Sequence, residues 1–186
     1  MPTNVVDRLH AEFQALITVL SAAAEPSLQS TANDCFRKAL LLTAASHFEA
    51  KISQTVLLFI SEASGSNERV TEFARQKGIS RQYHTWFDWE RTNANKFFAL
   101  FGEAFKKEMD ERVKGDDALD DSIKAFLEVG RERNRLVHQD FGNFTLEKTA
   151  TEIFELYQQA SAFAEALPGL LSNATKGGPA HPKPDT

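Results

Sequence analysis

Hydrophobic residues recur along the chain every three or four positions, the spacing of helices that bury one side. The pattern is long and regular over residues 4–24, 32–63 and 118–139, with a break over 21–30, around Pro26, between the first two segments. No segment alternates apolar and polar residues as a strand does, and no unit repeats at a fixed period. The sequence therefore predicts an all-α fold, an antiparallel helical bundle with additional short helices.

The middle of the chain is less regular than these long segments. Residues 68–77 and 80–89 are expected to form two short helices, and Ser80 is expected to cap the second. A helix over 93–114 is rich in phenylalanine, and its spacing indicates core packing rather than a platform for stacked bases. The spacing of hydrophobic residues assigns no role to the aromatic segment from Tyr83 to Trp89.

A last helix is expected after the turn that follows residue 139. Thr145 is expected to cap it, and Pro168 marks its end just after Leu167. The remaining residues are polar and rich in glycine and proline. We therefore expect a single helical domain over residues 1–171 and a disordered tail over 172–186.

Composition indicates an ordinary globular protein. Of 186 residues, 42% are hydrophobic and 25% are charged, which suits one domain with a buried core. The single cysteine, Cys35, excludes an internal disulfide and fits a reducing cytoplasm. We see no signal peptide and no stretch approaching the ~20 apolar residues of a membrane span, so a cytoplasmic protein without membrane contact is expected.

Charge and ligand spacing narrow the candidate functions. A net charge of −5 argues against a general nucleic-acid coat protein but leaves room for a local basic site. The segment from Arg69 to Arg91 is a candidate surface for guiding a nucleic-acid backbone, although a solvated mixed-charge face explains it as well. No zinc-ligand spacing and no phosphate-binding glycine loop are present, so no metal and no cofactor are expected.

The helix expected over residues 118–139 carries polar residues in its apolar stripe. At about 100° per residue, its apolar residues gather on one side, namely Leu119, Ile123, Phe126, Leu127, Gly130 and Val137. Arg133, Asn134 and His138 fall inside or at the edges of that sector, and each needs hydrogen-bond partners once water is removed. Outside it fall Glu128, Arg131, Glu132 and Arg135. Two interpretations remain: a polar cluster that fixes helix packing or a dimer seam, and an anion site with a titratable base.

The chemistry of these three residues favours the anion site. Arg133 offers a planar, permanently charged fork that suits phosphate oxygens. His138 carries the side chain that exchanges a proton near neutral pH. Asn134 lies four residues before His138, so its amide is expected to orient the imidazole. Together they would activate a ribose 2′-hydroxyl and neutralise the phosphate that it attacks.

The six residues Arg133-Asn134-Arg135-Leu136-Val137-His138 resemble the Arg-polar-x-x-x-His motif of HEPN domains, small all-helical proteins rich in metal-independent endoribonucleases. Two further strings are similar to the RiboL-PSP type of HEPN protein. They are Ala44-Ala45-Ser46-His47-Phe48-Glu49, and His138-Gln139-Asp140-Phe141 followed by Thr145-Leu146-Glu147. The resemblance covers about residues 30–167, most strongly 123–165, and implies a HEPN-like bundle.

The resemblance implies a metal-independent endoribonuclease that leaves 2′,3′-cyclic phosphate and 5′-hydroxyl ends. His138 would act as general base and then acid, Arg133 would stabilise charge on the phosphate, and Asn134 would hold the geometry. Glu49 is expected near Arg133 or His138 in the bundle. Arg131 and Arg135 are further candidate supporting residues, on the same helix as the motif.

The resemblance also implies a biological setting and partners. A bacterial toxin, antiviral-defence or stress system is expected, with RNA as substrate and an antitoxin or a neighbouring-gene protein as partner. HEPN toxins controlled by a nucleotidyltransferase typically carry a tyrosine two residues after the motif histidine, whereas this chain has Asp140, so that form of control is not expected. The alternatives are a non-catalytic HEPN scaffold that binds a nucleotide or a protein through the same helix, and a purely structural helical partner.

A homodimer is expected from helix geometry. Arg133 and His138 are about 140° apart around an ideal helix, so one motif has difficulty directing both side chains at one phosphate. A two-fold axis beside the helix end would gather two copies of each around one cleft. Gly130 would permit the close approach of a neighbouring backbone, from a second copy or from the same chain.

Overall fold

The computed structural model describes residues 4–139 and 141–174. Within these ranges the chain is helical and contains no β-strand, which confirms the all-α prediction. The helices are α1 Val5–Ala22, α2 Pro26–Ala63, α3 Glu68–Ala74, a π-helical turn Arg75–Ile79, α4 Tyr83–Trp86, α5 Asn95–Ala99, α6 Glu103–Lys114, α7 Asp117–His138 and α8 Ala150–Ala174.

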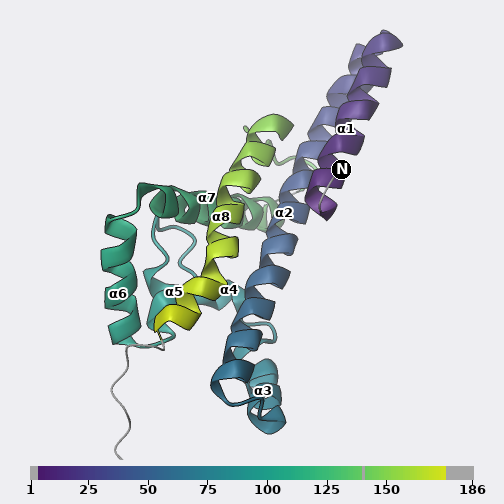
Figure 1. The fold of residues 1–186 in the computed structure, drawn as a ribbon. Helices are drawn as coiled ribbons and strands as arrows, with labels where there is room; N and C mark the ends of the chain where they lie inside the picture. Colours follow the sequence, from purple (N-terminus) through teal and green to yellow (C-terminus); the bar gives the residue numbers. More distant parts are fainter. Residues whose placement is uncertain (1–3, 140, 175–186) are drawn as a thin grey trace, which may run out of the picture.

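Helix α2 is the spine of the molecule. It has 38 residues. Helix α1 packs antiparallel against the N-terminal half of α2 (Figure 1). Helix α8 runs beside α2 in the same direction, and α7 packs on both α8 and α2 (Figure 1). The short helices α4 to α6 lie beside the α7–α8 side of the spine (Figure 1). This arrangement brings the motif helix α7 against the middle of α2.

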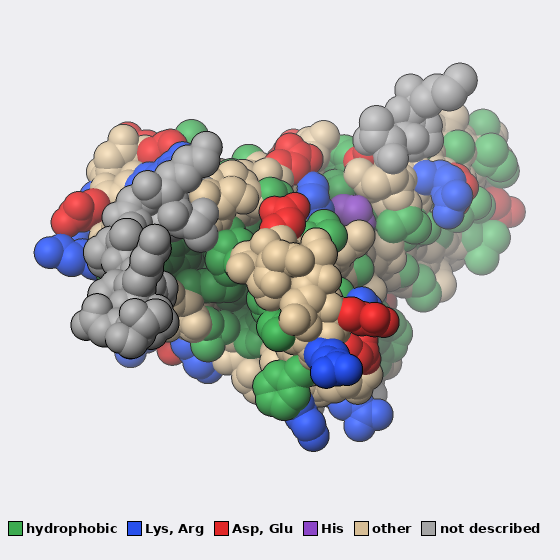
Figure 2. All heavy atoms as spheres, turned by 60° about the horizontal axis from the view of Figure 1, so that its bottom comes forward, with side chains coloured by type: hydrophobic (Ala, Val, Ile, Leu, Met, Phe, Trp, Pro, Cys, Tyr) green, Lys and Arg blue, Asp and Glu red, His purple; other side chains and the backbone are tan. Residues whose placement is uncertain are grey.

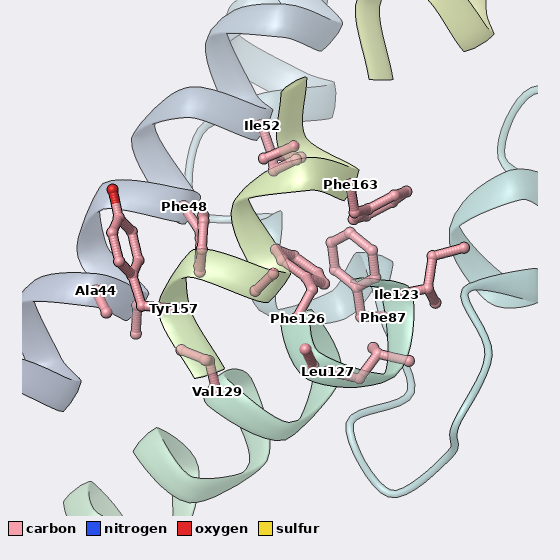
Figure 3. Close-up of a cluster of buried hydrophobic side chains, with 14 of the residues drawn as sticks. Ala44, Phe48, Ile52, Phe87, Ile123, Phe126, Leu127, Val129, Tyr157 and Phe163 are labelled. Atoms are coloured by element: carbon pink, nitrogen blue, oxygen red, sulfur yellow. The ribbon is translucent and has the colours of Figure 1, made fainter. Parts of the chain in front are cut away.

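Aromatic side chains fill the place where these helices meet. The ring of Phe126 on α7 lies 5.5 Å from Phe48 on α2, 5.0 Å from Phe87 and 5.2 Å from Phe163 on α8, centroid to centroid (Figure 3). All four side chains are buried. The expected packing role of the phenylalanines is therefore confirmed here, and the core fixes how α7 lies relative to α2.

Two predicted helix boundaries were wrong near proline and glycine. The break between the first helices covers only residues 23–25, because Pro26 begins α2 at a position where a backbone N–H has no helical partner anyway. The predicted helix over 93–114 is two helices, separated by a turn that ends at Gly102. The φ angle of Gly102 is +103°, a conformation that side chains other than glycine rarely adopt.

The short helix predicted over 80–89 is confined to α4 and is not capped by Ser80. The residue before α4 is Gln82, and Arg81 holds a positive φ of 62°, so the chain turns sharply between Ser80 and the helix. Trp89 lies in the loop that follows. That loop folds back and packs the indole against α7, as described below.

Both predicted ends of the last helix were also wrong. The cap is Thr149, whose hydroxyl accepts from the Glu152 N–H at 3.2 Å while the Glu152 carboxylate accepts from the Thr149 N–H at 2.7 Å. Helix α8 continues through Pro168 and ends at Ala174, so the first three residues of the predicted tail are helical. The buried side chains of Leu170 and Leu171 stabilise this continuation. Residues 175–186 of the predicted tail lie outside the described residues.

Candidate functional site

Near its C-terminus, helix α7 buries other residues than those that a spacing of about 100° per residue predicts. Its start is capped by Asp116, which accepts from the Leu119 N–H at 3.0 Å. Buried residues then follow to Leu136, but Val137 is 42% exposed while Glu132 is only 7% exposed. The prediction of Val137 in the buried stripe and of Glu132 outside it was wrong.

A narrow pocket forms where α7 faces α2 and α4. Its polar lining comes from three elements: Arg133 and Asn134 on α7, Glu49 on α2 and His84 on α4. Its apolar lining consists of Ala45, Phe48, Tyr83, Trp89, Phe126, Val129 and Gly130. The space inside is only about 10 Å³, room for roughly one water molecule, so a larger anion would meet these side chains at the mouth of the pocket. The structure thus brings Glu49 into one pocket with Arg133, as expected.

The motif arginine and asparagine contact each other. The guanidinium Nη1 of Arg133 donates to the side-chain oxygen of Asn134 at 3.2 Å. The amide of Asn134 was expected to orient His138, but its carbonyl oxygen instead accepts from Arg133. This bond holds the guanidinium at the pocket wall, and both side chains remain partly exposed. The fork of Arg133 is therefore accessible to an anion.

His138 lies outside the pocket. It is the last residue of α7 and is exposed, and its side chain forms no hydrogen bond or ion pair within the described part of the chain. Exposed apolar side chains flank it: Val137, and Phe141 with 51% exposure. The expected polar cluster of three residues is thus divided, with Arg133 and Asn134 in the pocket and His138 on the open surface.

The neighbouring arginines of the motif are engaged by Glu132. Nη1 of Arg135 lies 3.0 Å from a Glu132 carboxylate oxygen, and Nε of Arg131 lies 3.9 Å from the same oxygen. The guanidinium of Arg135 also lies over the ring of Phe144, 5.7 Å from its centroid. Arg131 and Arg135 therefore neutralise a nearly buried carboxylate, and neither lines the pocket.

His84 is the pocket residue that the sequence did not single out. Its Nε2 lies 3.8 Å from a carboxylate oxygen of Glu49. Its backbone carbonyl accepts from the indole N–H of Trp89 at 3.0 Å, and its ring lies edge-on to that of Tyr83 at 5.6 Å. No local pattern marks this residue, because the pair with Glu49 joins segments 35 positions apart in the sequence.

Gly130 makes room for the indole that holds His84. A Cβ atom at Gly130 would overlap the six-membered ring of Trp89. The close approach expected at this glycine is therefore made by a side chain of the same chain. Burial, helped by the negative charge of Glu49, raises the pKa of the neighbouring Tyr83 hydroxyl, which stays neutral.

The loop that follows His138 is tied to α2 by a buried lysine. Nζ of Lys38 donates to the Phe141 carbonyl at 3.2 Å, lies 5.3 Å from the Phe141 ring centroid and pairs with Asp34 at 2.9 Å. Asp140, the position two residues after the motif histidine, lies outside the described residues. Lys38 thus fixes the path of the chain just beyond the motif.

The basic segment from Arg69 to Arg91 does not form a continuous basic surface. Arg75 pairs with Glu72 at 3.1 Å and Arg91 pairs with Asp88 at 3.6 Å. On the face shown in Figure 2, basic and acidic side chains are interspersed. The mixed-charge interpretation of this segment describes these contacts better.

The hydropathy of the helices and the placement of metal-ligating side chains bear on the other expectations. None of the helices among the described residues is long and apolar enough to cross a membrane. No three His, Cys, Asp or Glu side chains converge there as ligands of one metal ion.

Comparison with known proteins agrees with this architecture. The sequence model of the RiboL-PSP-HEPN family matches residues 7–173, which includes the three helices that carry Glu49, His84, Arg133 and His138. No curated protein and no solved structure matches the chain. Because the family match spans most of its length, the chain belongs to the RiboL-PSP-HEPN family and has an all-α HEPN fold.

Proposed function

We propose that this protein is a metal-independent endoribonuclease that leaves 2′,3′-cyclic phosphate and 5′-hydroxyl ends. The observation that carries the proposal is the placement of a partly exposed Arg133 in the pocket lining, on the same helix as a solvent-exposed His138 that has no hydrogen-bond or ion-pair partner within the described residues. HEPN domains are frequently ribonucleases, and the motif residues keep the accessibility that such chemistry requires. The side chains of Arg133 and His138 are not buried in the core.

The proposed reaction needs a positive charge and proton transfer. Arg133 holds the phosphate through its fork, and the hydrogen bond to Asn134 limits how the guanidinium turns. His138 removes the proton of the 2′-hydroxyl, whose oxygen then attacks phosphorus while the bond to the 5′-oxygen breaks, and the 5′-oxygen takes up a proton from a general acid and leaves as a 5′-hydroxyl. No step requires an electron donor or a metal-bound water.

We further propose that the active form is a homodimer with the two α7 ends adjacent. His138 lies outside the pocket of its own Arg133, and the exposed Val137 and Phe141 provide apolar surface beside it. A second copy placed there would bring its His138 towards the pocket and cover these side chains. The composite arrangement thus joins the two separated halves of the motif.

Mixing two inactive variants tests the composite site. Arg133→Ala and His138→Ala are each expected to be inactive, and heterodimers formed from both should recover activity, because one chain supplies the arginine and the other the histidine. Light scattering on a sizing column should show twice the chain mass of 20.8 kDa. A fully active monomer, or mixtures that stay inactive although they dimerise, would refute the composite site.

Cleavage itself is tested with purified protein and total RNA, with and without EDTA, beside His138→Ala. We expect cleavage that EDTA leaves unchanged and that the variant loses. Cyclic-phosphate ends are detected because a phosphatase removes their phosphate only after acid has opened the cyclic diester, whereas a 3′-monophosphate is removed without acid. Loss of cleavage with EDTA, restored by a divalent ion, would assign the chemistry to a metal-dependent class.

The alternative function is a non-catalytic scaffold that binds a nucleotide or a protein through α7. The apolar residues exposed beside His138 favour it as specifically as they favour a dimer. It predicts binding of RNA or of a partner with no cleavage at all. The proposed setting, a bacterial toxin, defence or stress system in the cytoplasm, would be supported by growth arrest that depends on His138 when the protein is expressed.

A further inference from the structure

We propose that His84 is a second proton-transfer residue of this site, and that it donates the proton to the departing 5′-oxygen. The inference rests on the ribonuclease function proposed above and deepens it. It arises from one juxtaposition: His84, Glu49 and Arg133, on three different elements, line the same pocket. The HEPN motif itself contains only one titratable residue of this kind, His138.

The reaction has two protons to move at two different oxygens. The 2′-oxygen loses a proton as its bond to phosphorus forms, and the 5′-oxygen must gain one as its bond to phosphorus breaks, or leave as a high-energy alkoxide. One histidine can serve both only by transferring a proton across the phosphate. Two histidines can act together, with Arg133 neutralising the phosphate between them.

The surroundings of His84 suit the role of the acid. Its Nε2 lies 3.8 Å from a carboxylate oxygen of Glu49, so a negative charge stands beside the ring. Its Nδ1 has no hydrogen-bond partner among the described residues and remains available to a ligand. Both side chains are partly exposed, as access to a phosphodiester requires.

Neighbouring residues also hold His84 in place, and one of these contacts restricts which residue can stand at position 130. The Trp89 indole donates to its carbonyl, and only glycine at position 130 leaves space for that indole. The buried ring of Tyr83 lies against the imidazole from the core side. Glu49 is accordingly a positioning residue, since it acts on the substrate through His84.

Changing the leaving group of the RNA substrate distinguishes a general acid from a residue with a structural role. Wild-type protein and His84→Gln are compared on RNA with an ordinary linkage and on RNA in which sulfur replaces the bridging 5′-oxygen, because a thiolate leaves without a proton. His84→Gln should slow ordinary RNA by about 100-fold and cleave the sulfur-bridged RNA at nearly the wild-type rate. Glu49→Gln should show the same pattern with a smaller loss.

A matched control is His47→Gln, on α2 and outside the pocket lining, which should leave both rates unchanged. Circular dichroism establishes that each variant is folded. Equal losses on both substrates would make His84 a structural or binding residue, and a wild-type rate on ordinary RNA would remove it from the reaction; either result overturns the inference while the ribonuclease function stands. If wild-type protein cleaves neither substrate, the proposed function fails and the acid role fails with it.

Discussion

Arg133 and His138 belong to one six-residue motif, yet the two ends of that motif lie in contrasting surroundings. Around Arg133, three helices line one pocket. The Trp89 indole packs on Gly130 there, and His84 lies 3.8 Å from the Glu49 carboxylate. Around His138, the helix ends, the imidazole has no partner within the described residues, and the nearby apolar side chains face solvent. The pocket end is built from side chains of one chain, whereas the other end exposes its histidine and the apolar side chains beside it to solvent.

The largest expected effect comes from the open end of the motif. We expect His138→Ala to lower the rate of RNA cleavage by about 10²- to 10⁴-fold, the usual contribution of a general acid or base. The free energy of unfolding should change by less than about 0.5 kcal/mol, since the side chain is exposed and has no partner among the residues that the structure describes. Gel assays and urea unfolding measure the two quantities. A large loss of stability would show that His138 packs in the working protein.

At the pocket end, Arg133→Lys should keep the charge and lose about 100-fold in cleavage rate, because an ammonium cannot grip two phosphate oxygens as the fork does. It also cannot reproduce the bond to Asn134 in the same geometry. Steady-state kinetics on a defined RNA gives the rate, and Arg131→Lys is the control, since that arginine pairs with Glu128 and Glu132. Equal activity of the two variants would mean that a point charge suffices at the pocket.

The contrast between the two ends also marks what the sequence could predict. The long helices follow from their periodicity alone. The burial of Glu132 does not follow from periodicity. It depends on Arg131 and Arg135, which pair with the carboxylate, and on Phe144, whose ring lies beside Arg135. His84 was missed for a related reason, since it reaches Glu49 only after the chain has folded.

Some errors were avoidable from local spacing. Thr149 and Glu152 have the three-residue spacing of a capping box, whereas Thr145 is followed by Glu147 at a spacing of two. Other errors were not avoidable. The continuation of α8 through Pro168 depends on leucines buried against the rest of the bundle, which outweigh the local preference for a break.

The rigidity of the pocket end can be tested through its glycine. Gly130→Ala should destabilise the protein by about 1–3 kcal/mol, the cost of an extra methyl group in a packed place, because its Cβ would overlap Trp89. The melting temperature should fall by several degrees and cleavage should weaken as His84 shifts. Gly169→Ala is the control, because its Cβ meets nothing within 4 Å and a helical alanine is favoured over glycine. Equal melting temperatures for the two variants would argue against a tightly packed pocket.

The smallest expected effect concerns Lys38, the link between the loop beyond His138 and α2. Lys38→Met should change the free energy of unfolding by less than about 1 kcal/mol, since the apolar chain fills the same space and the Asp34 carboxylate left behind is partly exposed and keeps its pair with Arg37. The bond to the Phe141 carbonyl and the pair with Asp34 are lost, so the loop should exchange its amide hydrogens faster. Cleavage should fall only a few-fold, because the loop sets where the α7 end and its histidine lie. Lys51→Met, which removes a pair with Glu165 away from the loop, is the control. Unchanged exchange in the loop would show that the open end of the motif is held by something other than this lysine, whereas a loss as large as that of His138→Ala would place Lys38 in the reaction itself.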